Sequence, residues 1–274
     1  MKVLNGLELA GYIKERQAKQ VRNLRQGYKT FPKLAIIRTT DNPVILTYVH
    51  KKQHYGEDIL IAVDDHRPAN EDEALELIRQ LNADTSVHGI IVQLPLNDPS
   101  RTDELVNEVA PEKDVDALGA HAVLDAATPM AINWLLTGYN VELSGKHIVI
   151  IGNGRLVGAP LARMWRNSGL DVEVLDSSVS DLASAVKSAD IVVTATGNPG
   201  LITADMLREN AVVVDAATAS EDGKIVGDVA QDVRSRDDLT ITPEKGGVGP
   251  LTVTALFDNV IRAARATTKD QAPS

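Results

Sequence analysis

The 274-residue chain contains no cysteine, and this absence excludes disulfides, thiolate catalysis and cysteine-ligated zinc. The six histidines form no HExxH-like pair, so the sequence supports no metal site. Basic residues are outnumbered, with 28 Lys and Arg against 38 Asp and Glu. The net charge of −10 argues against nucleic acid as a partner, because phosphate-backbone binding relies on clustered Lys and Arg. An anionic substrate must therefore be held by local donors.

Long apolar runs are also missing. No stretch of the chain approaches the roughly 18 apolar residues of a membrane span. The opening M-K-V-L-N-G-L-E-L-A lacks the apolar core of a signal peptide. We therefore expect a soluble, cytoplasmic protein with no membrane partner.

Strand-like and helix-like segments alternate from end to end, which predicts an α/β fold with parallel sheets and crossover helices. The length favours two domains, divided between Asp116 and Thr128. In the first half we predict helices over 7–25, 43–55 and 71–82 and strands over 34–38, 59–63 and 89–93. The second half is predicted to hold strands over 148–151, 171–175, 191–194 and 212–215, with a closing helix over 252–265.

A glycine-rich turn connects a strand and a helix within H-I-V-I-I-G-N-G-R-L-V-G-A-P, with the helix predicted to start near Arg155. Gly152 can make the tight turn, and Gly154 lets backbone N–H groups approach a pyrophosphate at the positive end of the helix. Asp176 ends the next apolar run at a distance suited to gripping a ribose diol. This context predicts a nicotinamide dinucleotide site, and a purely structural turn is the alternative.

Tyr48 and Lys52 lie four residues apart on a predicted helix, so an aromatic ring and an amine share one face. Lys52 can transfer protons if its surroundings lower its pKa, whereas an isolated Y-x-x-x-K favours a solvated basic face. Gln93 ends a strand, at the edge where ligands of α/β sheets gather. Asp114 and Asp116 are expected on one side of a short extended piece, where a carboxylate can accept paired N–H donors from a heterocycle. Solvated loop charges are the alternative for this pair.

Together, these motifs and their order resemble the bifunctional methylenetetrahydrofolate dehydrogenase/cyclohydrolase family, over nearly the whole chain. The resemblance is carried by D-N-P followed by Y-V-H-K-K, by G-I-I-V-Q-L-P-L, by P-E-K-D-V-D, by T-P at 128, by V-G-A-P after the glycine loop, by D-G-K-I-V-G-D-V and by I-T-P-x-x-G-G-V-G-P-L-T-V. Q-L-P-L and G-G-V-G-P with this spacing are specific, although G-G-V-G-P alone would indicate only a flexible joint before a helix.

The resemblance implies an enzyme of one-carbon metabolism. It would oxidise 5,10-methylenetetrahydrofolate with NAD or NADP and hydrolyse the methenyl product to 10-formyltetrahydrofolate. The implied architecture is a folate-binding catalytic domain over 1–125, to which a C-terminal helix over 250–268 returns, and a Rossmann-like dinucleotide-binding domain over 126–249. The resemblance also implies an active-site cleft between the domains and a homodimer formed through the second one.

Four residues match the family's catalytic positions. Lys52 matches the catalytic lysine, and Gln93 matches the glutamine that hydrogen-bonds it. Tyr48 matches the tyrosine that stacks on the substrate, and Asp116 the aspartate that holds the pterin. Further substrate contacts are expected at Leu94, Pro95, Gly246, Gly247, Pro250 and Thr252. Cofactor contacts are expected at Gly152, Asn153, Gly154, Arg155, Leu156, Val157, Asp176, Ser177, Thr196, Gly197 and Thr218.

The glycine loop departs from the family pattern, because Gly154 replaces its usual serine and Asn153 the basic residue before it. The spacing to Gly158 is one residue longer than in G-x-G-x-x-G. Asp176 lies where a histidine-serine pair would otherwise meet a 2′-phosphate, so its charge would repel NADP and accept from the free 2′-hydroxyl of NAD. We therefore expect NAD as the preferred cofactor, with NADP possible.

Two other departures lie near the expected folate and cofactor sites: K-D-V-D-A replaces K-D-V-D-G, and D-A-A-T-A at 215–219 replaces D-V-G-I-N. One alternative function is a catalytically weakened or silent dinucleotide-binding homologue with a regulatory role. Another is a related dehydrogenase that acts on a different small substrate. Q-L-P-L together with Asp116 argues for folate, and the four retained residues argue against a silent protein.

Overall fold

The computed structural model describes residues 1–217, 219–221 and 224–268, and the chain forms two compact units. The small-sheet unit contains Gly11–Ala127 together with the chain from Val253 onward. The large-sheet unit contains Met1–Ala10 and Thr128–Thr252. Both sheets are parallel with helical connections, which confirms the predicted α/β class. No helix of the described residues is long and apolar enough to cross a membrane.

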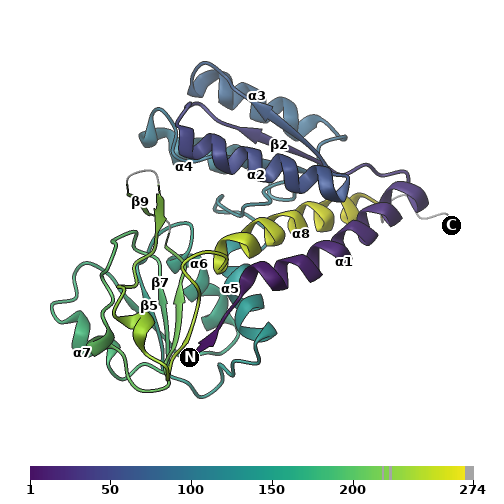
Figure 1. Ribbon diagram of the computed structural model, residues 1–274. Helices are drawn as coiled ribbons and strands as arrows, with labels where there is room; N and C mark the ends of the chain where they lie inside the picture. The colour runs from purple at the N-terminus through teal and green to yellow at the C-terminus, as the bar shows by residue number, and fades with distance from the viewer. Residues whose placement is uncertain (218, 222–223, 269–274) are drawn as a thin grey trace. The chain divides into compact units, whose positions relative to one another are not determined.

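The small-sheet unit is built on three parallel strands in the order β3–β2–β4. Ala35 and Ile37 of β2 pack with helix α3, so Leu34 and Ile36 face the opposite side by strand alternation. Figure 1 shows α2 and α3 on opposite sides of β2. The strands are β2 (Lys33–Ile37), β3 (Ala62–His66) and β4 (Gly89–Val92), and the helices are α2 (Pro43–Ile59), α3 (Glu71–Ala83), η1 (Pro99–Arg101) and α4 (Thr102–Glu108).

The strand predicted over 59–63 is wrong at its start. Helix α2 continues to Ile59, because this side chain extends the buried face already formed by Ile45 and Val49. Leu60 then ends the helix in the left-handed conformation, with its N–H bonded to the carbonyls of Glu57 and Gly56. The apolar run therefore divides between a helix end and strand β3.

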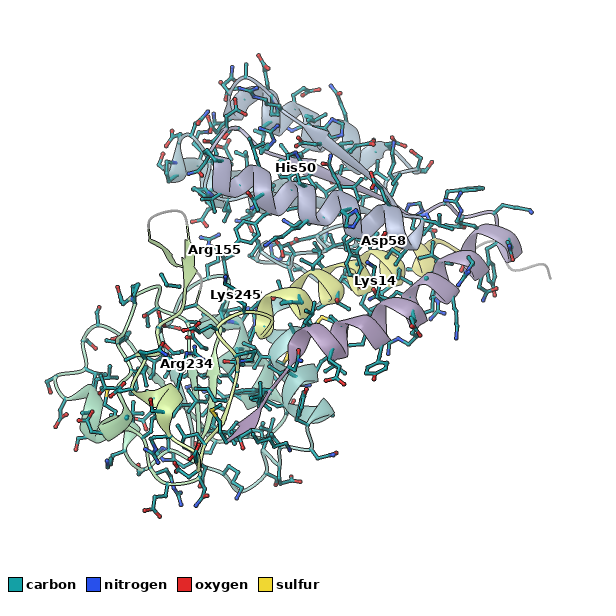
Figure 2. All side chains as sticks on the ribbon, viewed as in Figure 1. Lys14, His50, Asp58, Arg155, Arg234 and Lys245 are labelled. Carbon is teal, nitrogen blue, oxygen red and sulfur yellow. The ribbon has the colours of Figure 1, made fainter. Side chains whose placement is uncertain are left out.

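Helices α1 (Gly6–Gly27) and α8 (Val248–Thr268) run side by side (Figure 1), and from Gly11 and Val253 onward they belong to the small-sheet unit. Gln17 donates through Nε2 to the carbonyl oxygen of Thr254 at 2.9 Å and accepts from the Tyr55 hydroxyl at 2.7 Å. The Tyr55 ring stacks on Phe257 with 4.9 Å between ring centroids. Asn259 donates to the carbonyls of Val115 and Asp125. An exposed ion pair of Lys14 with Asp58 adds a link from α1 to α2 (Figure 2).

The large-sheet unit holds six parallel strands in the order β1–β11–β8–β7–β5–β6. Strand β5 is flanked by β6 on one side and β7 on the other, so the chain reverses its direction of winding at β5. Ligands of such sheets bind outside the carboxyl ends of the strands at this switch point. The strands are β1 (Lys2–Val3), β5 (Ile148–Ile151), β6 (Val172–Leu175), β7 (Ile191–Thr194), β8 (Val212–Asp215) and β11 (Thr240–Ile241).

Helices cover both faces of the large sheet, with α5 and α6 on one side of β5 and β7 and α7 on the other (Figure 1). Val149, Val192 and Val213 pack in one cluster with Val186 of α7. The remaining elements of this unit are α5 (Ala127–Gly138), α6 (Gly158–Asn167), α7 (Leu182–Val186), η2 (Ala204–Met206), η3 (Val233–Ser235) and the antiparallel pair β9 (Ala219–Glu221) and β10 (Lys224–Val226).

The first residues of the chain belong to a different unit from the one predicted for 1–125. Lys2 and Val3 form strand β1, which pairs with Thr240 and Ile241 of β11. Residues 1–10 therefore join the large-sheet unit, while α8 beyond Val253 joins the small-sheet unit.

Candidate functional site

Lys52 and Gln93 meet at the carboxyl edge of the small sheet. Lys52 lies on α2, and Gln93 follows β4 directly, with its backbone N–H bonded to the carbonyl of Ile37 on β2. The Lys52 Nζ donates to the Gln93 Oε1 at 2.6 Å. The Gln93 Nε2 donates to the carbonyl of Leu94, which fixes the amide with its oxygen toward the lysine. The two residues are 41 apart in sequence, and the parallel strand order brings them together.

Lys52 and Asp116 are half-buried and perturb each other. Burial lowers the pKa of the Lys52 ammonium, and the nearby Asp116 carboxylate opposes this effect. Burial raises the pKa of Asp116, and Lys52 opposes that effect in turn. Desolvation penalises both charges, so the two groups approach each other in proton affinity. This is an arrangement suited to proton transfer.

Tyr48 lies one helical turn before Lys52 and is half-buried. The Nζ of the neighbouring Lys51 lies 5.5 Å from the centroid of its ring. The side chains of Tyr48 and Lys52 share one face of α2, as the four-residue spacing predicts. Of the two other expected folate contacts in this unit, Leu94 is half-buried and Pro95 is exposed.

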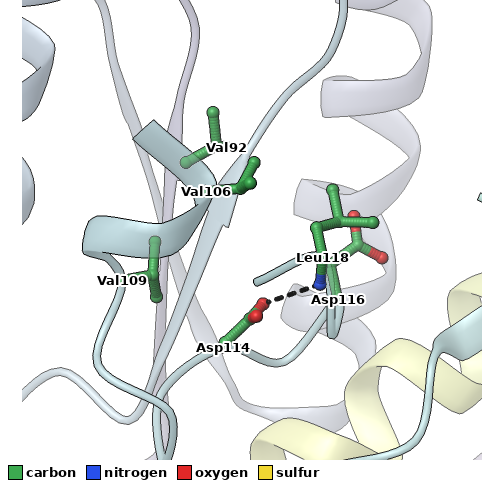
Figure 3. Close-up of a pocket in the computed structure, with 6 residues that line it drawn as sticks. All are labelled: Val92, Val106, Val109, Asp114, Asp116 and Leu118. Carbon is green, nitrogen blue, oxygen red and sulfur yellow. Dashed lines mark hydrogen bonds between the residues drawn. The ribbon is translucent and has the colours of Figure 1, made fainter. Parts of the chain in front are cut away.

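Asp114 and Asp116 line one small pocket, but Asp114 is buried and Asp116 is half-buried. Asp114 is buried and accepts from the backbone N–H groups of Leu118 and Gly119 at 3.4 and 2.8 Å. It lines a small pocket with Val92, Val106, Val109, Leu118 and Asp116 itself, and in Figure 3 the Asp116 carboxylate points away from Asp114. Asp114 therefore shapes the turn, and Asp116 is the carboxylate that acts on Lys52.

Ala117 follows Asp116 with a left-handed φ of 55°, a conformation that disfavours any side chain. Ala117→Gly should raise the free energy of unfolding by about 0.5–1 kcal/mol, because relief of this backbone outweighs the added freedom of the unfolded chain. Urea denaturation measures the change. Ala110 lies outside the left-handed region, so Ala110→Gly should instead lower stability by about 0.4–1 kcal/mol. A destabilised Ala117→Gly variant would contradict the prediction.

The glycine loop follows β5 at the switch point of the large sheet. Gly152 has a φ of 101°, and a Cβ atom there would lie 2.7 Å from the carbonyl oxygen of Ala195. A Cβ atom at Gly158 would overlap the carbonyl oxygen of Gly152. The third glycine of the motif therefore serves close strand-to-helix packing. A Cβ atom at Gly154 would meet no atom within 4 Å, so this position is open.

Helix α6 begins at Gly158 and not near Arg155, which corrects the predicted start. Residues 155–157 form a turn instead, and this turn accommodates the extra residue of the G-x-G-x-x-x-G spacing. Asn153, Arg155 and Leu156 are exposed, and Val157 is half-buried. The exposed backbone of the loop at the carboxyl end of β5 fits a dinucleotide pyrophosphate.

Asp176 follows β6, the strand next to the glycine loop, and its neighbour Ser177 is exposed like Asp176 itself. The Asp176 carboxylate accepts from the Ser178 hydroxyl at 2.6 Å and from the Ser178 N–H at 2.9 Å. These bonds lower the pKa of Asp176, so the side chain is ionised at neutral pH. The backbone N–H of Gly152 bonds to the carbonyl of Leu175, so Asp176 is held beside the loop.

Thr196 and Gly197 follow β7 on the other side of β5, with Gly197 at a φ of 71°. The Cγ2 of Thr196 lies 3.2 Å from the place of a Cβ atom at Gly152. The loops after β5 and β7 therefore lie against each other at the switch point. Thr218 lies outside the described residues.

Gly246 and Gly247 directly precede α8, within the large-sheet unit. Gly246 has a φ of 83°, and its carbonyl accepts from the N–H of Leu7 at 2.9 Å. Pro250 lies in the first turn of α8, where no N–H is needed. Thr252 donates to the carbonyl of Val248 at 3.3 Å. In the described ranges no group of three or more His, Asp or Glu is placed to hold a metal ion.

Two family models match the chain. The model for the tetrahydrofolate dehydrogenase/cyclohydrolase catalytic domain matches residues 4–116. The model for the NAD(P)-binding domain of the same family matches residues 126–268. Among curated relatives, the bifunctional protein FolD of Cenarchaeum symbiosum is 38% identical over 275 residues, covering 95% of this chain and 97% of that one.

Solved structures give the same result. The bifunctional FolD enzyme of Campylobacter jejuni superposes with a TM-score of 0.92 at 35% identity, covering 97% of this chain and 99% of that one. The FolD enzyme of Trypanosoma brucei, solved with NADP and an inhibitor, superposes with a TM-score of 0.90 at 29% identity and covers 97% of both chains.

Proposed function

Because the chain belongs to the tetrahydrofolate dehydrogenase/cyclohydrolase family, we propose that it oxidises 5,10-methylenetetrahydrofolate with a nicotinamide dinucleotide and hydrolyses the methenyl product to 10-formyltetrahydrofolate. The observation that carries this proposal is the 2.6 Å hydrogen bond from Lys52 to Gln93 beside Asp116. A spectrophotometric assay with methylenetetrahydrofolate and each dinucleotide, followed by decay of the methenyl product, tests both reactions. A protein that forms no methenyl product would be the silent homologue or a dehydrogenase for another substrate.

The oxidation is mainly a problem of positioning. Bound dinucleotide supplies the hydride acceptor, and the protein orients the folate toward it. We propose that the Tyr48 ring stacks on the folate and that Asp116 accepts N–H donors of the pterin. Loss of hydride leaves a methenyl cation on the folate, which the hydrolytic step then consumes.

Lys52 assists hydrolysis as a neutral amine. Burial lowers its pKa, and a cationic substrate nearby lowers it further, because a second positive charge is unfavourable there. One amine N–H bonds to the Gln93 oxygen, so the lone pair is available to take a proton from water as its oxygen attacks the methenyl carbon. The carbon–N5 bond then breaks as the new hydroxyl group loses its proton to solvent and becomes the formyl carbonyl, and Lys52 returns the first proton to N5. Gln93 thus orients Lys52 and holds its charge state.

We propose NAD as the preferred cofactor, because Asp176 presents an ionised carboxylate beside the glycine loop. The kcat/KM for NAD should exceed that for NADP by about 10-fold or more, since the carboxylate repels a 2′-phosphate and accepts from a free 2′-hydroxyl. Asp176→Ser should shift the ratio toward NADP by a similar factor. Steady-state kinetics with both dinucleotides measure it.

The control for this substitution is Asp171→Asn, at the opposite end of β6, where the side chain is exposed. This variant removes a carboxylate from the same strand but should leave the ratio unchanged. A wild-type enzyme that prefers NADP would overturn the role of Asp176.

We further propose that the enzyme is a cytoplasmic homodimer formed through the large-sheet unit. The support for this is the resemblance to the family. Sedimentation equilibrium and cell fractionation test the two parts separately.

A further inference from the structure

A buried carboxylate holds the loop that follows β7. Asp228 is completely buried, and its carboxylate accepts four hydrogen bonds from Thr194, Thr196 and Asn198. The Thr196 N–H and hydroxyl donate to Oδ2 at 2.7 and 2.9 Å, and so does the buried Thr194 hydroxyl. The Asn198 N–H donates to Oδ1 at 2.8 Å. A buried carboxylate needs such a set of donors, so the carboxylate and the loop fix each other.

The backbone of Asp228 is itself anchored. Its N–H donates to the Asp215 Oδ1 at 3.2 Å, and the Val229 N–H donates to the Asp215 Oδ2 at 3.1 Å. A Cβ atom at Gly227 would overlap the Asp215 carboxylate, so glycine is required there. Arg234, labelled in Figure 2, lies 3.9 Å from the same carboxylate. The Asp228 side chain therefore reaches the loop after β7 from a backbone segment that is held in place by Asp215.

The loop that Asp228 holds forms one wall of the switch point. The Ala195 carbonyl oxygen and the Thr196 Cγ2 lie 2.7 and 3.2 Å from the place of a Cβ atom at Gly152. Any loosening of residues 194–198 would therefore also release the glycine loop.

We infer that Asp228 is a positioning residue for the dinucleotide: it holds Thr196 and Gly197 against Gly152 in the shape that binds the cofactor. This inference rests on the proposed dinucleotide site. The hydrolytic step consumes water and no dinucleotide, so it does not depend on this loop. A substitution of Asp228 should therefore weaken the dehydrogenase activity and leave the cyclohydrolase activity of the same chain intact.

Asp228→Asn tests the inference with almost no change in size. The N–H groups of Thr196 and Asn198 bond to different oxygens, so the new amide must turn its NH2 toward one of them. The KM and Kd for the dinucleotide should rise about 10-fold or more. The folate KM and the cyclohydrolase kcat/KM should stay within about twofold. Proportional loss of both activities with unchanged KM would show a purely structural role and overturn the inference.

Asp190→Asn is the matched control, because Asp190 lies at the other end of β7 and accepts from the His147 N–H at 2.9 Å. Its dinucleotide KM should not change. If Asp228→Asn fails to fold, Thr194→Val provides a second test, because it removes one hydroxyl donor to Asp228 and keeps a residue that favours β-strands. This variant should raise the dinucleotide KM about threefold. An unchanged KM in Thr194→Val would then overturn the inference. A wild-type enzyme that reduces neither dinucleotide would instead refute the proposed function.

Discussion

Lys52→Met is expected to lower cyclohydrolase kcat/KM by about 10²–10⁴-fold, the usual contribution of a positioned proton-transfer group. Dehydrogenase activity should fall by less than about 10-fold, because hydride transfer depends on positioning and on the dinucleotide. Methionine keeps most of the apolar stem of the side chain and removes the amine bonded to Gln93. Hydrolysis of added methenyltetrahydrofolate and reduction of the dinucleotide are measured separately on one preparation.

Lys51→Met provides the control, since it makes the same substitution at an exposed neighbour. Both activities should remain within a few-fold of the wild type. Equal retention of both activities in Lys52→Met would refute the catalytic role, and equal loss of both would indicate a structural lysine.

The pH profile reports on the same amine. Only the unprotonated form can accept a proton from water, so hydrolysis should increase as pH rises through the pKa of Lys52. Burial lowers that pKa from its ordinary value, and the rise should therefore occur below the pH at which an exposed lysine titrates. The increase should disappear in Lys52→Met.

The sheet strands could be predicted where burial on both faces produces a continuous apolar run. Ile148–Ile151 is fully buried and was predictable to the residue. Strand β1 has only two residues, and its pairing with β11 depends on a chain separation of more than 230 residues, which no local pattern encodes. The strand predicted over 59–63 was wrong at its start for a different reason. Ile59 is equally suited to the buried face of a helix and to a strand.

The site residues also differ in whether a local sequence pattern predicts their contacts. The position of Lys52 opposite Gln93 follows from a helix face and a strand end, and the family motifs point to both residues. Asp228 lies in the D-G-K-I-V-G-D-V motif, but nothing in that motif indicates its partners. Those partners, Thr194 to Asn198, are 30 to 34 residues away in sequence. Only tertiary structure shows that this aspartate belongs to the switch-point loop.

Gly158→Ala is expected to destabilise the large-sheet unit by about 3 kcal/mol or more, because the new methyl group overlaps the backbone carbonyl of Gly152. Neither partner can rotate away: Gly152 directly follows β5 and Gly158 begins α6, so relief requires strand and helix to separate. A midpoint of thermal unfolding lower by at least about 6 °C would report this cost.

Gly154→Ala makes the same change four residues earlier, at a place where no atom lies within 4 Å of the new methyl group. Its unfolding midpoint should stay within about 2 °C of the wild type, consistent with a surface change that touches nothing. The pair therefore separates two reasons for glycine within one loop, because position 158 requires it for packing and position 154 does not. Equal destabilisation by both substitutions would mean that the loop needs glycine for backbone freedom throughout, and the packing role of Gly158 would then be wrong.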